Sequence, residues 1–220
     1  MNGIFFQEPI EDAHIADILE EIYMNRLYDP YLSNRKDLTI LDVGANVGLF
    51  SYYASQFGKV YALEPAKEHV KMMKEMLTLN GIQDKVNVYP MALSNVDGET
   101  VLSHSSNVTA HSLHPAVEGA KVELGLDDEV VQTCTIKTFL EKEKIETVDF
   151  MKLDVEGWEF QILSSKEFEE CAPRIKEIVG EWHAWTQTKP VQLTNMLRDY
   201  GYRAEWLNKS NASIFHAVRP

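Results

Sequence analysis

Cysteine is scarce in this chain of 220 residues, which contains only Cys134 and Cys171. The two lie far apart and lack C-x-x-C spacing, so we expect small buried thiols in a reducing compartment. Long apolar runs are also missing, because no stretch reaches the ~18 residues that a membrane span needs. The first residues lack the cationic start and apolar core of a signal peptide. The sequence therefore predicts a cytoplasmic protein that does not enter a membrane.

Positive charge is scarce too. Lysine and arginine together number 21 against 34 aspartates and glutamates, which gives a formal net charge of −13. Proteins bind nucleic acids and anionic membranes mainly through cationic side chains, so both are disfavoured as partners. The apolar fraction of 45% and the charged fraction of 25% are ordinary for a globular domain. Length and composition together predict a single domain over 1–220.

Apolar patterning alternates strands with helices, which predicts an α/β fold with a mostly parallel sheet covered by helices on both faces. Residues 1–35 are expected to form a helical cap, and the polar segment 103–128 a lid loop. Two late runs, 202–207 and 213–218, predict a closing antiparallel hairpin. We expect strands at 39–43, 60–63, 86–89, 130–136, 148–153 and 174–180, and helices at 11–27, 47–57, 65–80, 137–143, 157–169 and 190–200.

The strongest motif is the glycine turn Asp42-Val43-Gly44-Ala45-Asn46-Val47-Gly48, which joins a predicted strand to a predicted helix. Doubly wound sheets bind nucleotides at such turns, and Glu64 at the end of the next strand is placed to accept both ribose hydroxyls. A dinucleotide site requires a second glycine where Asn46 stands. The spacing therefore favours S-adenosylmethionine over a nicotinamide dinucleotide. A nicotinamide-dependent oxidoreductase is the first alternative, and a module that binds the cofactor without catalysis is the second.

Ionisable residues follow two further predicted strands. Lys152, Asp154 and Glu156 lie on one side of the strand end near 153, and Glu181 and His183 follow the strand at 174–180. Parallel strands end at one edge of a sheet, so we expect Asp154, Glu156, Glu181 and His183 to meet there. An unperturbed imidazole has a pKa of about 6.5, which makes His183 the candidate general base for a hydroxyl acceptor. The alternatives are an ion pair between Lys152 and one of the acids, and a purely structural hydrogen bond between Glu181 and His183.

Carboxylate side chains at the same edge indicate a second way to activate an acceptor hydroxyl, which is a bound metal ion. Asp154, Glu156 and Glu181 are compatible with Mg²⁺ or Ca²⁺, which would lower the pKa of an acceptor hydroxyl. The sequence favours the metal-free route. Two acids around one valine on a single strand position a hydroxyl and a nearby lysine more readily than they enclose an ion.

The run LTILDVGANVGLFSYYASQFGKVYALEP resembles the cofactor motif of the FkbM-type S-adenosylmethionine-dependent methyltransferases. The runs VDFMKLDVEGWEFQIL and GEWH resemble two further signatures of that family. The resemblance implies a class I methyltransferase fold, with a seven-stranded sheet, and O-methylation of a small hydroxylated metabolite or sugar. The residues expected to bind the cofactor are Asp42, Gly44, Ala45, Asn46, Gly48, Glu64, Pro65 and Ala92, and those expected to serve catalysis are Lys152, Asp154, Glu156, Glu181 and His183.

Overall fold

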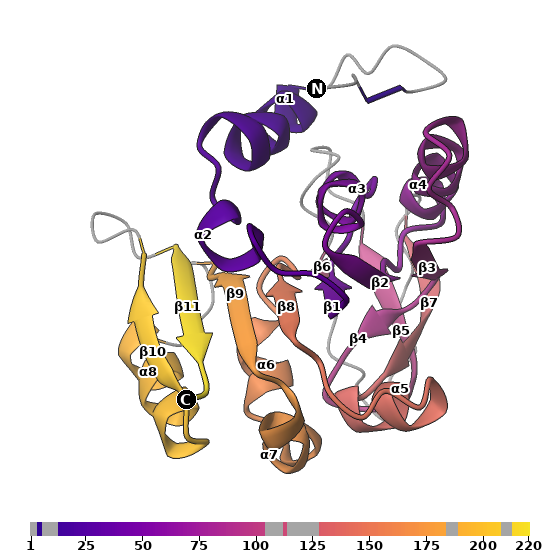
Figure 1. Ribbon diagram of the computed structural model, residues 1–220. Helices are drawn as coiled ribbons and strands as arrows, with labels where there is room; N and C mark the ends of the chain where they lie inside the picture. The colour runs from indigo at the N-terminus through magenta and orange to yellow at the C-terminus, as the bar shows by residue number, and fades with distance from the viewer. Residues whose placement is uncertain (1–3, 6–12, 104–111, 114–127, 184–188, 208–212) are drawn as a thin grey trace.

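A computed structural model describes residues 4–5, 13–103, 112–113, 128–183, 189–207 and 213–220 (Figure 1). Its centre is a seven-stranded sheet in the order β10-β11-β9-β8-β1-β2-β3. Neighbouring strands are parallel except around β11, which runs antiparallel to both β9 and β10. The strands are β1 (Leu38–Val43), β2 (Gly58–Leu63), β3 (Val86–Tyr89), β8 (Phe150–Leu153), β9 (Glu177–Glu181), β10 (Arg203–Trp206) and β11 (Ile214–Val218). The mostly parallel sheet with an antiparallel C-terminal hairpin is confirmed.

Helices cover both faces of this sheet (Figure 1). The helices form two groups, one on each face of the sheet. Buried residues of β1 alternate between them, so that Ile40 packs against the first group and Leu41 against the second. The first group contains α1 (Ala13–Leu19), the π-helical turn η1 (Glu20–Met24), α2 (Asp29–Leu32), α3 (Leu49–Ala54) and α4 (Lys67–Leu79). The second contains α5 (Ile136–Lys142), α6 (Glu159–Leu163), α7 (Lys166–Cys171), the 3₁₀ turn η2 (Ala172–Arg174) and α8 (Pro190–Asp199). The sheet is therefore buried on both sides, as its near-continuous apolar strands predict.

A second sheet of four short strands was not expected from the sequence. Its order is β4-β7-β5-β6, with β4 (Ala92–Leu93), β5 (Gly98–Ser103), β6 (Ser112–Leu113) and β7 (Glu129–Cys134). The strand predicted at 130–136 belongs here, antiparallel to β5, and not in the main sheet. β6 lies inside the predicted lid loop at 103–128, so that segment is not loop throughout. Residues 104–111 and 114–127 of the lid lie outside the described residues.

Most remaining elements match their predicted ranges within a few residues. The helix predicted at 157–169 is two helices, α6 and α7, because the hydroxyl of Ser165 accepts a hydrogen bond from the Phe168 N–H and caps a new helix. Both cysteines are free and buried, as expected. Within the described ranges, no helix combines the length and apolar character that crossing a bilayer requires.

Candidate active site

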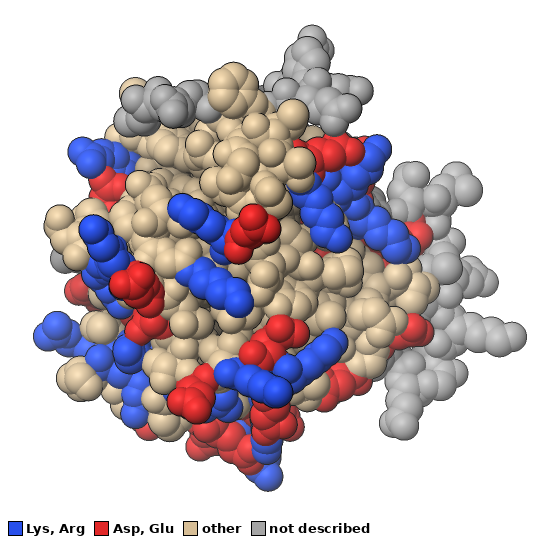
Figure 2. Space-filling view, turned by 45° about the vertical axis from the view of Figure 1, so that its right-hand side comes forward, with Lys and Arg blue, Asp and Glu red and all other residues tan. Residues whose placement is uncertain are grey.

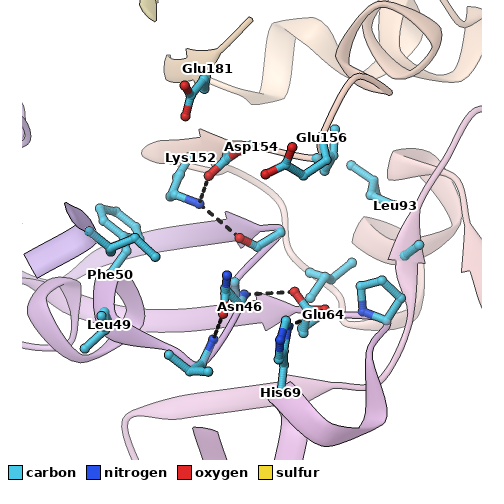
Figure 3. Close-up of a pocket in the computed structure, with 18 of the residues that line it drawn as sticks. Asn46, Leu49, Phe50, Glu64, His69, Leu93, Lys152, Asp154, Glu156 and Glu181 are labelled. Atoms are coloured by element: carbon cyan, nitrogen blue, oxygen red, sulfur yellow. Dashed lines mark hydrogen bonds and ion pairs between the residues drawn. The ribbon is translucent and has the colours of Figure 1, made fainter. Parts of the chain in front are cut away.

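A pocket that is partly open to solvent lies at the carboxyl ends of β1, β2 and β8, with about 990 Å³ of empty space when the solvent at its mouth is included. The glycine turn after β1 and Glu64 after β2 form one side, while Lys152, Asp154 and Glu156 form another (Figure 3). Glu181, the last residue of β9, also faces the pocket. Glu21 of η1 lines it as well, so the N-terminal helices close part of the space. Doubly wound sheets bind small-molecule ligands and cofactors at this position, outside the carboxyl ends of their parallel strands.

Close packing against β8 explains the first glycine of the turn. Gly44 has a φ of +76°, and a Cβ added there would stand 1.7 Å from the carbonyl oxygen of Asp154. Asn46 also has a positive φ, of 51°, which asparagine tolerates better than most residues. Its side-chain oxygen accepts a hydrogen bond from the Val47 N–H. The turn therefore brings the cofactor side of the pocket directly against the strand end that carries Asp154.

Glu64 joins two loops. One of its carboxylate oxygens accepts a hydrogen bond from the Asn46 N–H at 2.8 Å, and the other accepts one from the Ala66 N–H at 2.9 Å. The imidazole of His69 lies 3.6 Å from the second oxygen. Glu64 is only 5% exposed. It therefore holds the glycine turn against the start of α4, in addition to the ribose role that the sequence predicts.

Asp42 and Gly48 lie behind the pocket wall, unlike the other predicted cofactor residues. Asp42 is fully buried and accepts a hydrogen bond from the Ser51 hydroxyl. Burial raises its pKa. Gly48 precedes α3 with a φ of +87°, and a Cβ there would stand 2.4 Å from the Met73 side chain. The predicted residues that do line the pocket on the cofactor side are Gly44, Ala45, Asn46, Glu64, Pro65 and Ala92.

Lys152 connects the turn to the acidic edge. Its ammonium donates to the Gly44 carbonyl oxygen at 3.0 Å and to Asp154 at 3.1 Å, and it lies 3.8 Å from Asp42. The sheet register pairs Lys152 directly with Asp42 across β8 and β1. Burial opposes its charge, but Asp154 and Asp42 outweigh burial and raise its pKa. This is the ion pair given above as the structural alternative for Lys152.

Carboxylates dominate the far side of the pocket. Burial raises the pKa of Glu156 to about 7, and burial together with nearby Asp154 raises the pKa of Glu181 to about 7. Burial also raises the pKa of Glu21, which accepts a hydrogen bond from the Tyr28 hydroxyl. Glu156 has a φ of +52°, in the left-handed region that residues other than glycine adopt uncommonly.

His183 lies behind this carboxylate edge. Its Nε2 is 3.3 Å from Glu156 and 3.9 Å from Asp154, and its Nδ1 is 2.7 Å from Glu159. Burial opposes an imidazolium, but the hydrogen bond and charge of Glu159, with Asp154 and Glu156, raise the pKa of His183 to about 9. His183 is not one of the described residues that line the pocket. The expected convergence with Asp154 and Glu156 is observed, and the hydrogen-bonding carboxylate is Glu159.

Sequence reasoning missed Glu159. This side chain is fully buried at the start of α6, and its Oε1 accepts hydrogen bonds from the backbone N–H groups of Val155 and Gly157. The signal was present, because Glu159 stands three residues after Glu156 within the same motif. Glu21 was missed because it comes from the N-terminal helices, which carry no motif.

Comparison with known proteins identifies the family. The family described as "Methyltransferase FkbM domain" matches residues 42–204. The chain belongs to the FkbM methyltransferase family. It is therefore an S-adenosylmethionine-dependent methyltransferase, and this decides against the nicotinamide alternative.

Individual relatives of this FkbM-family chain agree. It is 27% identical over 222 residues to the methyltransferase sdnD of Sordaria araneosa, covering 86% of this chain and 84% of the relative. Its structure resembles methyltransferase FkbM from Methylobacillus flagellatus KT, with a TM-score of 0.57, 13% identity, and 83% and 44% of the two chains covered. It also resembles the METTL16 methyltransferase domain, with a TM-score of 0.59, 11% identity, and 99% and 73% covered. These structures confirm the class I methyltransferase fold.

Proposed function

We propose that this methyltransferase transfers the methyl group of S-adenosylmethionine to a hydroxyl of a small metabolite or sugar. One observation carries the proposal: a single pocket joins the glycine turn and Glu64 to the pocket-facing carboxylates of Asp154, Glu156 and Glu181. The first half of this pocket suits the cofactor, and the second suits a hydroxylated acceptor.

The cofactor half fits S-adenosylmethionine. Glu64 already accepts two backbone hydrogen bonds, but each carboxylate oxygen keeps a further lone pair for a ribose hydroxyl. Asn46 places a side chain where a dinucleotide would need close approach of its pyrophosphate to the backbone. The neighbouring carboxylates repel phosphate and attract the cationic cofactor.

The acceptor half suits a hydroxyl group. When bound, S-adenosylmethionine supplies an electrophilic methyl group, and the receiving oxygen must be held in line and lose its proton. Carboxylates provide both functions, since they accept a hydrogen bond from O–H and, when ionised, accept the proton. We assign this role to Glu156 and Glu181, which line the pocket. His183 would contact an acceptor only through Glu156, so we assign it a positioning role in place of the general-base role expected from the sequence.

Charge also narrows the acceptor class. Glu21, Asp154, Glu156 and Glu181 surround the acceptor end, and the ammonium of Lys152 is already paired. A phosphorylated or carboxylated acceptor would be repelled, whereas a neutral polyol or sugar would find hydrogen-bond acceptors. Nucleic acid is disfavoured for the same reason. Figure 2 shows acidic and basic side chains interspersed over one face, without a broad basic patch on that face.

Transfer of a labelled methyl group tests the proposal. The protein is incubated with ¹³C-methyl S-adenosylmethionine and a neutral metabolite fraction, and products are followed by NMR. We expect new methoxy carbon signals that are lost with Glu181→Gln and retained with the exposed control Glu68→Gln. Label appearing only on nitrogen, sulfur or carbon would contradict O-methylation while leaving the methyltransferase assignment intact.

A further inference from the structure

The geometry behind the acidic edge points to a binding site for one divalent metal cation, formed by His183, Asp154 and Glu156. We propose that this site takes a first-row transition ion such as Mn²⁺. The site extends the proposed function, on which its catalytic meaning depends. It also reverses the metal-free preference drawn from the sequence, and it replaces the all-carboxylate set considered there with one that contains an imidazole.

Two of the proposed donor atoms lie close to the third, the Nε2 of His183. His183 Nε2 lies 3.3 Å from a Glu156 oxygen and 3.9 Å from an Asp154 oxygen. Ligands held ~2.1 Å from one metal ion at tetrahedral or octahedral angles lie about 3.0–3.4 Å apart. The first distance matches this range, and the second, at 3.9 Å, must shorten by at least about 0.5 Å through a side-chain rotation when the ion binds. The second Asp154 oxygen binds Lys152, so Asp154 can serve both partners.

Glu159 provides the second observation. It lies on the other ring nitrogen of His183, at 2.7 Å, and is fully buried. A carboxylate on the far nitrogen of a metal-binding histidine fixes the tautomer that directs the lone pair of the near nitrogen at the metal. The second oxygen of Glu159 is buried and has no hydrogen-bond partner among the described residues. Donor atoms of Asp154, Glu159 and His183 all lie within 4.8 Å of one another.

Charge balance favours a divalent cation over a proton at this point. A proton on Nε2 makes His183 a single positive charge facing Glu159, Glu156 and Asp154. Lys152 is shared between Asp154 and Asp42, so acidic groups remain in excess around the pocket. A divalent ion bound to a neutral His183 supplies one more positive charge than that proton. Mixed imidazole and carboxylate ligands suit Mn²⁺ or Fe²⁺ better than Mg²⁺, which prefers oxygen alone.

At this position the cation would adjoin the pocket through Asp154 and Glu156, both of which line it. A hydroxyl bound to it would become more acidic, and Glu181 is then the nearby carboxylate left to receive the proton. Glu156 would thus be a ligand. The strained conformation of Glu156 would serve to direct its carboxylate toward His183.

Binding of Mn²⁺ to the purified full-length chain tests the site without a known acceptor. Free Mn²⁺ is counted by electron paramagnetic resonance at neutral pH after chelator treatment, with and without S-adenosylhomocysteine. We expect one saturable site, weaker binding of Mg²⁺, and at least tenfold weaker Mn²⁺ binding in Glu156→Gln and His183→Gln. Glu159→Gln should weaken Mn²⁺ about 10–100-fold, the usual effect of losing an outer-shell partner.

The control is Glu170→Gln, an exposed carboxylate paired with Lys137, which should bind Mn²⁺ like the wild type. Calorimetry with S-adenosylhomocysteine reports whether each variant remains folded and separates the two proposals. Absence of saturable Mn²⁺ binding in a wild-type protein that binds S-adenosylhomocysteine would overturn the metal site alone. Equal Mn²⁺ affinity of wild type and Glu156→Gln would also overturn it. Mn²⁺ binding without S-adenosylhomocysteine binding would leave the metal site standing and count against the proposed function.

Discussion

Replacing Glu64 should weaken the fold and the cofactor site together. Its carboxylate accepts the backbone N–H groups of Asn46 and Ala66 in a buried position. A hydrogen bond to a charged group contributes about 1.5–3 kcal/mol, so Glu64→Ala should lower the free energy of unfolding by about 3–6 kcal/mol. Glu64→Gln keeps one acceptor oxygen and should lose about half as much.

Cofactor affinity should fall in the same order. Loss of two ribose hydrogen bonds to the carboxylate, at about 1.5–3 kcal/mol each, corresponds to about 100-fold to 10,000-fold weaker S-adenosylhomocysteine binding. Urea unfolding followed by tryptophan fluorescence gives the stability, and calorimetry gives the affinity. Glu68→Gln in the exposed first turn of α4 is the control, with an expected stability change below about 1 kcal/mol. Weaker binding of S-adenosylhomocysteine with unchanged stability in Glu64→Ala would refute the structural link between the two loops.

Three further perturbations test the surroundings of the pocket. Gly44→Ala should abolish S-adenosylhomocysteine binding, measured by calorimetry, because the new Cβ would stand 1.7 Å from a backbone oxygen. Gly81→Ala is the control: Gly81 also has a positive φ but has no neighbour within 4 Å, so the variant should lose only about 1 kcal/mol of folding stability and keep its binding. Lys152→Met should cost about 3–5 kcal/mol in urea unfolding because it leaves Asp42 buried without its ammonium partner, and adding Asp42→Asn should recover part of the loss. Burial raises the pKa of Asp149, but hydrogen bonds from a lysine and a backbone N–H outweigh burial and lower it. Its stabilising contribution is therefore complete at neutral pH and is lost progressively as pH falls below about 4, so Asp149→Asn should destabilise at pH 7, and its difference from the wild type in urea unfolding should shrink as the pH is lowered further.

The sequence predicted the main sheet because its strands are buried on both faces and therefore read as continuous apolar runs. The second sheet gave no such signal. β5 buries only Leu102 among its six residues, so neither an apolar run nor an alternating pattern marks it. The strand at 130–136 was predicted, but its place in the second sheet was not, because pairing partners depend on tertiary structure that one strand does not encode.

The pocket was predictable where a motif followed a strand end. Gly44, Glu64, Asp154 and Glu156 were placed correctly on its wall because the carboxyl ends of parallel strands share one edge. How deeply each of these side chains is buried was not predictable from the sequence. Whether a side chain such as Asp42 faces the ligand or the protein interior depends on the helix packed against it.

A crystal structure of the protein with S-adenosylhomocysteine would show how the pocket is divided between the cofactor and the acceptor. We expect both ribose hydroxyls within about 3 Å of the Glu64 carboxylate and the cofactor sulfur directed at the edge formed by Asp154, Glu156 and Glu181. A ribose bound away from Glu64, or a sulfur directed away from those carboxylates, would contradict this division of the pocket.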